Sequence, residues 1–183
     1  MLRAFSDWQY RSITTRRTIA ATALFVAFVL TVAAAELMFG VLSSGPQPVP
    51  DLMPGYAPSD LYPLFERYSA EERTHFVWMR FTLDLVWPIL YAGALCAWMS
   101  AALGRTVAAS SALRLANLLP ALAALLDALE NMALSVVILR APLRTPGVDL
   151  AASLFTLCKW SAVVVSVLAL LWGLGRMARG RTV

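Results

Sequence analysis

The sequence predicts an all-α fold, an integral membrane four-helix bundle with short interfacial helices and a long periplasmic loop between helices 1 and 2. Of its 183 residues, 60% are hydrophobic and 14% are charged, and the mean hydropathy is +0.69. A soluble chain is about half apolar and a quarter charged. One crossing of a bilayer core needs roughly 20 mainly apolar helical residues. Four stretches meet this requirement, residues 19–42, 76–103, 113–139 and 150–174, and with the outer loop 43–75 they are expected to form one transmembrane domain over residues 1–183.

The first stretch has one feature of a secretory signal. Ala33, Ala34 and Ala35 resemble a cleavage site that follows an apolar run. The apolar run continues past these alanines through Leu37 and Phe39. We therefore expect this segment to be retained as a membrane-spanning helix.

The outer loop divides into an irregular part and a helical part. Residues 43–58 contain five prolines, which exclude a regular helix and favour extended turns. Beyond them, apolar residues recur at the spacing of one helix face, which predicts an interfacial helix whose apolar side meets lipid or the bundle. The residues on this face are Leu61, Leu64, Phe65 and Tyr68.

Two shorter signals flank the first two spans. Ser69 followed by Glu72 has the spacing of a capping box, which predicts the start of the helix that leads into the second span. Leu2, Phe5 and Trp8 predict a second interfacial piece within the first dozen residues.

The distribution of arginine and lysine predicts the orientation, because short cytoplasmic flanks of membrane spans are enriched in these residues. The long outer loop carries arginines as well, but acidic residues accompany them there. Both termini are therefore expected in the cytoplasm, and the protein is expected in the inner membrane of a bacterium. The flanking residues on the cytoplasmic side are Arg3, Arg11, Arg16, Arg17, Arg105, Arg114, Arg176, Arg179 and Arg181.

Five charged residues lie inside the predicted spans, where each costs about 2.5–3.5 kcal/mol on insertion scales. At 1.5 Å per helical residue, all five lie roughly 9–18 Å below the outer ends of their helices. Every span contributes at least one of them, which predicts a shared polar interior in the outer half of the bundle. The five residues are Glu36, Asp84, Asp127, Glu130 and Lys159.

Helical periodicity places several of these residues on common sides. Asp127, Glu130 and Asn131 are spaced i, i+3 and i+4, so they lie on one side of the third span. On the other spans, the residues that share a side are Asp84 with Tyr91, and Thr156 with Lys159.

A purely structural interpretation of this polar set is open. In it, Lys159 pairs with Glu130 or Asp127, Asn131 completes the network, and the polar set fixes helix register. Interhelical hydrogen bonds in membranes average only about 0.6 kcal/mol, so such contacts stabilise little relative to their insertion cost. Four carboxylates also face one lysine, and close carboxylates in a buried site favour holding at least one proton. This surplus favours a functional site.

The composition excludes several classes of protein. Two cysteines are too few for a disulfide scaffold, and one histidine is too few for a bis-histidine haem or a histidine-rich metal site. We therefore expect no cofactor and no metal. The net charge of +4 comes from basic residues at helix ends, not on one face, so no nucleic acid partner is expected. The expected partners are the membrane and a lipid or lipophilic small molecule, and a homo-oligomer or a larger membrane complex stays open.

Four motifs carry a resemblance to other proteins. They are residues 50–56, the Leu-Asp-x-x-x-Pro-x-x-Tyr pattern of 83–91, the Asp-x-x-Glu-Asn element of 127–131, and residues 157–160. Together they resemble an uncharacterised group of small bacterial four-helix inner-membrane proteins. The resemblance implies the same fold and location, and it implies no activity.

The leading hypothesis is a buried carboxylate and lysine pocket that binds a lipophilic or cationic small molecule, with acid/base chemistry as an open extension. Whether the chain is an enzyme is left open. One alternative is a noncatalytic accessory subunit of a respiratory, photosynthetic or transport complex, and another is a proton-coupled carrier that acts as a homodimer. The expected roles are Asp127 and Glu130 as the acid/base pair, Asp84 and Glu36 as modulators of their proton affinity, Lys159 as counter-ion, and Asn131 and Tyr91 as groups that orient the ligand.

Overall fold

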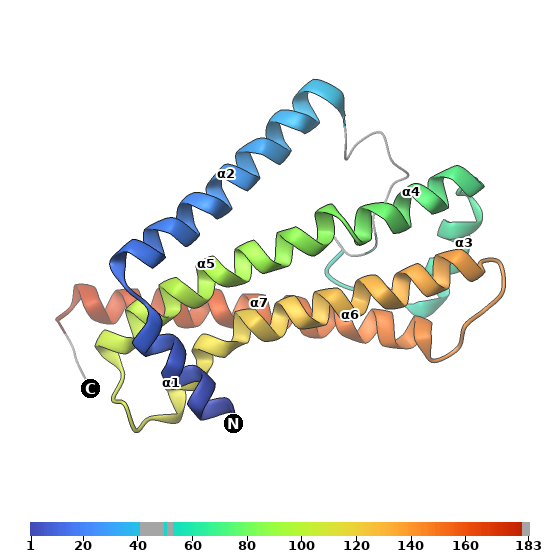
Figure 1. Ribbon diagram of the computed structural model, residues 1–183. Coiled ribbons are helices and arrows are strands. Elements are labelled where there is room, and N and C mark those ends of the chain that lie inside the picture. Colours follow the sequence, from blue (N-terminus) through green and yellow to red (C-terminus); the bar gives the residue numbers. More distant parts are fainter. Residues whose placement is uncertain (41–49, 51–52, 181–183) are drawn as a thin grey trace. The chain divides into compact units, whose positions relative to one another are not determined.

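A computed structural model describes residues 1–40, 50 and 53–180 (Figure 1). Within these residues all regular structure is helical, as the sequence predicts. The expected extended turns of residues 43–58 fall largely outside the described residues. The helices are α1 (Leu2–Ser12), α2 (Thr15–Phe39), α3 (Pro58–Glu66), α4 (Ala70–Arg80), α5 (Leu83–Thr106), the 3-10 helix η2 (Ala112–Leu118), α6 (Leu119–Arg140) and α7 (Val148–Ala178).

Among the described residues, four helical segments are long and apolar enough to cross a membrane. They are residues 15–39, 70–106, 112–140 and 148–178, so each predicted span coincides with one helical segment. No side chain of α2 is buried. A helix that is apolar on all sides and contacts little protein is suited to a lipid environment. These features indicate a multi-pass membrane protein.

The second predicted span, expected as one helix over 76–103, is instead interrupted. α4 ends at Arg80, and α5 begins at Leu83 after a turn at Phe81 and Thr82. The hydroxyl of Thr82 donates to the carbonyl oxygen of Trp78 at 2.8 Å. Threonine side chains that bond back to the preceding turn in this way compete with the helical backbone pattern and bend helices. The start of α4 agrees with prediction, because Ser69 and Glu72 form the expected capping box.

The described chain comprises two compact units. Unit 1 contains residues 1–28, 89–124 and 161–183, and unit 2 contains residues 29–88 and 125–160. In unit 2, Leu61 and Phe65 of α3 are fully buried in a core with Leu134 and Ile138 of α6. The predicted apolar face of α3 therefore packs against protein. The helix begins at Pro58, where proline is favoured, and Asp60 accepts a hydrogen bond from the Ala57 N–H at 2.9 Å.

Unit 1 joins its helices through polar contacts as well as an apolar core. The core contains Met99, Leu103 and Leu170. The indole N–H of Trp98 on α5 donates to the hydroxyl of Thr22 on α2 at 2.8 Å. Such contacts fix neighbouring helices in a lipid environment that offers no competing hydrogen-bond partners.

Tyr10 of α1 is expected to make unit 1 sensitive to alkaline pH. Burial raises the pKa of Tyr10 from 10.0 to about 12, Arg114 opposes this effect, and Asp7 reinforces it. The phenol is neutral in both folded and unfolded chains below pH 10.0, so its contribution to stability is complete there. Between pH 10.0 and about 12 only the unfolded phenol ionises, so the free energy of unfolding should fall with rising pH.

Unfolding of the wild type and of Tyr10→Phe across this range would measure the effect. Tyr10→Phe removes the ionisable hydroxyl, so its stability should depend less steeply on pH than that of the wild type. Equal slopes for the two proteins would contradict the assignment to Tyr10.

Candidate functional site

The centre of the candidate site is a buried ion cluster between α6 and α7, within unit 2. The Nζ atom of Lys159 lies 3.0 Å from Oδ1 of Asp127 and 2.6 Å from Oε2 of Glu130. Lys159 is 5% exposed, Asp127 is 7% exposed and Glu130 is fully buried. The i, i+3 spacing of the two acids puts both carboxylates on the side of α6 that faces the lysine. The structural interpretation of the sequence is confirmed to this extent, because Lys159 pairs with both acids.

Thr156 extends the cluster by one turn of α7. Its Oγ1 atom is a hydrogen-bonding partner of a Glu130 oxygen, of the Ala152 carbonyl oxygen at 3.0 Å and of the Tyr56 hydroxyl at 3.1 Å. A threonine hydroxyl has one proton to donate and two lone pairs to accept with. Because the Ala152 carbonyl oxygen has no proton to donate, three full hydrogen bonds need one proton each from Thr156, Tyr56 and Glu130.

Asp84, a further acid predicted for the site, has a cationic partner on the preceding helix. Its carboxylate forms an ion pair with Arg80, one helical turn earlier across the α4–α5 turn. The guanidinium carbon of Arg80 also lies 4.3 Å from the centroid of the Phe76 ring. Arg80 is buried, whereas the side chain of Asp84 is 29% exposed. Arg80 was not among the interior residues predicted from the sequence, although its i, i+4 spacing from Asp84 was a usable signal.

Two further predicted residues, Glu36 and Tyr91, are only partly buried. Glu36 is partly exposed on α2, a helix without buried side chains. Tyr91 is partly buried on α5 and belongs to unit 1.

Asn131 is buried on the Asp127 side of α6, but it does not complete the network as the structural interpretation expected. It is 2% exposed, and neither polar atom of its side chain has a hydrogen-bond partner among the described residues. A buried polar group without a partner costs about 1–3 kcal/mol. Asn131 is therefore a destabilising residue in the isolated chain.

Replacing Asn131 by leucine is expected to stabilise the protein by about 1 kcal/mol, because leucine keeps the branched shape and removes an unpaired amide. Asn117 offers a matched control, since it is also fully buried but bonds to Ser6 at 2.7 Å and Ser100 at 3.1 Å. Asn117→Leu should destabilise by about 1–3 kcal/mol. Chemical denaturation in detergent micelles would compare them, and destabilisation by both would show that Asn131 is paired.

A second polar cluster in unit 2 connects α3 to the start of α7. The hydroxyl of Tyr62 donates to Oδ2 of Asp149 at 2.7 Å and accepts from the backbone N–H of Thr145 at 2.7 Å. All three residues are buried. Sequence reasoning missed this cluster, because Tyr62 and Asp149 are 87 residues apart and share no periodic pattern.

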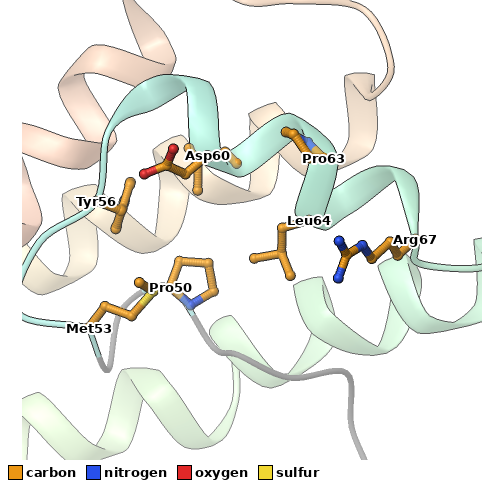
Figure 2. A pocket seen from close by; sticks show the side chains of 8 residues that line it. Pro50, Met53, Tyr56, Asp60, Pro63, Leu64 and Arg67 are labelled. Carbon is orange, nitrogen blue, oxygen red and sulfur yellow. The ribbon is translucent and has the colours of Figure 1, made fainter.

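A cavity of about 210 Å³ lies beside α3 in unit 2 (Figure 2). Met53 and Leu64 contribute apolar lining, while Tyr56, Asp60 and Arg67 contribute the polar part. The carboxylate of Asp60 is occupied by its capping contacts at the start of α3. Tyr56 both lines this cavity and contacts Thr156. None of the site residues predicted from the sequence lines this cavity.

The described residues show no group of three or more histidine, cysteine, aspartate or glutamate side chains arranged to hold a metal ion. Comparisons with protein-family models, curated proteins and solved structures give no match to this chain. The candidate site therefore has to be interpreted from its own geometry.

Proposed function

We propose that this protein binds a small lipophilic molecule in the cavity beside α3, and that the buried carboxylates serve this site as a proton store. The observation that carries the proposal is the double role of Tyr56. This residue lines the cavity, and its hydroxyl lies 3.1 Å from the Thr156 hydroxyl, which contacts Glu130. A continuous series of polar contacts thus leads from the cavity to Lys159 and Asp127.

Proton counting supports a neutral cluster. If Glu130 holds a proton, it donates to Thr156, Thr156 donates to the Ala152 carbonyl, and Tyr56 donates to the second lone pair of Thr156. All three contacts are then satisfied, and Lys159 balances the remaining charge on Asp127. With an ionised Glu130, Thr156 would have one proton for both the Glu130 carboxylate and the Ala152 carbonyl oxygen.

The neutral cluster favours a lipophilic ligand over a cationic one. In the neutral cluster Lys159 is the counter-ion of Asp127, the carboxylate that stays charged. The cluster therefore does not need a cationic ligand to balance its charge. The cavity is lined in part by Met53 and Leu64, and apolar cavities of about 150 Å³ accept benzene-sized molecules. The ligand class is therefore a compact apolar molecule with one group able to exchange a proton.

A cavity-filling variant tests binding. The probe is a small halogenated phenol, and its binding to protein in detergent micelles is followed by ligand-observed NMR. Leu64→Trp fills the cavity and should weaken binding at least tenfold. Leu154→Trp adds the same side chain at an exposed position of α7 and should leave binding unchanged. Equal affinity for both variants would contradict the proposed cavity.

The proton store is tested by calorimetric titration of the same phenol in buffers of different ionisation enthalpy. The wild type should exchange protons with the buffer on binding. Tyr56→Phe should retain binding and lose most of this exchange, because it removes the hydroxyl that contacts Thr156. Unchanged proton exchange in Tyr56→Phe would refute the role of the buried carboxylates while leaving binding intact.

The proposed location is a bacterial inner membrane with both termini in the cytoplasm. The support is the arginine distribution in the flanks of the four spans and the resemblance to small bacterial membrane proteins. Reporter fusions at Val183 and within residues 43–49 would test the orientation, and activity of the same reporter at both positions would contradict it.

A further inference from the structure

Helix α1 contacts the rest of unit 1 through its polar side chains. The Ser6 hydroxyl donates to Oδ1 of Asn117 at 2.7 Å, and the Tyr10 hydroxyl donates to the Arg114 carbonyl at 2.9 Å. Arg3 donates to the carbonyl of Ser110 at 2.6 Å. Ser6 is the buried residue of this helix. A soluble amphipathic helix would instead place its apolar side against the protein.

The apolar side chains of α1 face outward. Phe5 is 48% exposed and Trp8 is 54% exposed. Their rings stack at a centroid distance of 5.6 Å, so they form one continuous apolar surface. By helical periodicity, this surface lies on a different side of the helix from Ser6 and Tyr10.

The chain itself limits what can cover this surface. Only Ile13 and Thr14 separate α1 from α2, the first membrane-spanning helix. Three Cα steps of about 3.8 Å link Ser12 to Thr15, so the end of α1 lies within about 11 Å of the start of that span. At this position α1 is beside the bilayer surface, where Trp side chains are enriched and exposed apolar side chains meet lipid.

The charge beside this surface selects the kind of lipid. Arg11, Arg16 and Arg17 are exposed, and Asp7 is the only acidic residue among the first 35. Basic residues near a membrane surface attract anionic headgroups.

We infer that α1 is a membrane-surface helix that binds anionic lipid. Phe5 and Trp8 enter the boundary between headgroups and acyl chains, and Arg11, Arg16 and Arg17 contact the phosphates. The polar contacts of Ser6 and Tyr10 hold the helix in this orientation. This inference concerns unit 1 and does not depend on the proposed cavity function.

The test uses the full chain in nanodiscs of phosphatidylcholine alone or mixed with phosphatidylglycerol. The quencher is a lipid brominated near the headgroup end of its acyl chain, and the contribution of Trp8 is the difference between wild type and Trp8→Phe. We expect Trp8 to be quenched by the brominated lipid, and at least twofold more strongly in the anionic discs. The triple variant Arg11→Gln/Arg16→Gln/Arg17→Gln should lose this dependence on lipid charge.

A matched triple variant, Arg67→Gln/Arg140→Gln/Arg144→Gln, removes the same charge from exposed positions of unit 2 and should leave Trp8 quenching unchanged. Quenching of Trp8 by acrylamide but not by brominated lipid would overturn the inference, because the surface would then face water. Shielding from both quenchers in a dimeric protein would also overturn it, because a second copy would then cover the surface. Equal lipid quenching in both kinds of disc would overturn the anionic preference.

Discussion

The double variant Asp127→Asn/Glu130→Gln is expected to unfold with a free energy about 3–5 kcal/mol lower than the wild type, the usual cost of breaking a buried ion pair by removing one partner. Each single variant should cost far less. The loss in the double variant should therefore exceed the sum of the two single losses by at least about 2 kcal/mol, within the coupling energies seen for residues in one network.

The reason is that, in the neutral cluster proposed above, two carboxylates share one lysine and one proton. Glu130→Gln replaces a protonated carboxyl group by a neutral group of the same shape, so Lys159 keeps Asp127 as its counter-ion. In Asp127→Asn, Glu130 can release its proton and take over that role at 2.6 Å from the Lys159 Nζ atom. Only the double variant removes both anions that face the buried ammonium group, and strongly coupled sites of this kind titrate as one unit.

Unfolding of the four proteins of this cycle in detergent micelles would measure the coupling. Adding Lys159→Met to the double variant removes the buried cation and should recover most of the lost stability, because apolar replacements of buried ion pairs are often neutral or better. Additive losses in the cycle would contradict the shared proton, whatever the size of each loss.

The fold was predictable from the sequence to the extent that lipid imposes it. A bilayer demands long apolar helices, so composition and length located all four spans. The turn at Phe81 and Thr82 could not be predicted from the apolar pattern, and the back-bond of the Thr82 hydroxyl is no signal for it, because Thr156 makes the same bond within the continuous helix α7. The apolar face of α3 was visible, but periodicity does not distinguish burial in protein from contact with lipid.

The candidate site, like the fold, was predictable from the sequence only in part. The spacing of Asp127 and Glu130 and the depth of Lys159 led to an interior cluster, and these three residues do meet. Asp84 was assigned to the same interior by its depth and helical face, and the ion pair that the structure describes for it is with Arg80, one turn away. Tyr56 could not be assigned to the network, since its contact with Thr156 joins residues 100 positions apart. Depth and helical face restrict which residues can meet, but they do not choose among hydrogen-bond partners.

Tyr62→Phe is expected to lower the free energy of unfolding by about 3 kcal/mol, a large effect for the loss of one oxygen atom. The hydroxyl makes a hydrogen bond to the Asp149 carboxylate and accepts one from the Thr145 N–H, both at 2.7 Å. A hydrogen bond to a charged group contributes about 1.5–3 kcal/mol, and a buried N–H without its acceptor costs about 1–3 kcal/mol. Asp149→Asn keeps an oxygen acceptor at the same place and should cost only about 1 kcal/mol, the worth of the lost charge assistance.

The same substitution should also weaken the cavity, because Tyr62 connects α3 to the start of α7. Leu64 and Arg67, at the end of α3, line the cavity, so loosening α3 changes its shape. We expect Tyr62→Phe to reduce binding of the phenol probe severalfold at temperatures where the variant is still folded. Asp149→Asn should retain most of the binding, because the Tyr62 hydroxyl can still bond to both partners. Full binding by a destabilised Tyr62→Phe variant would show that the position of α3 does not control the cavity.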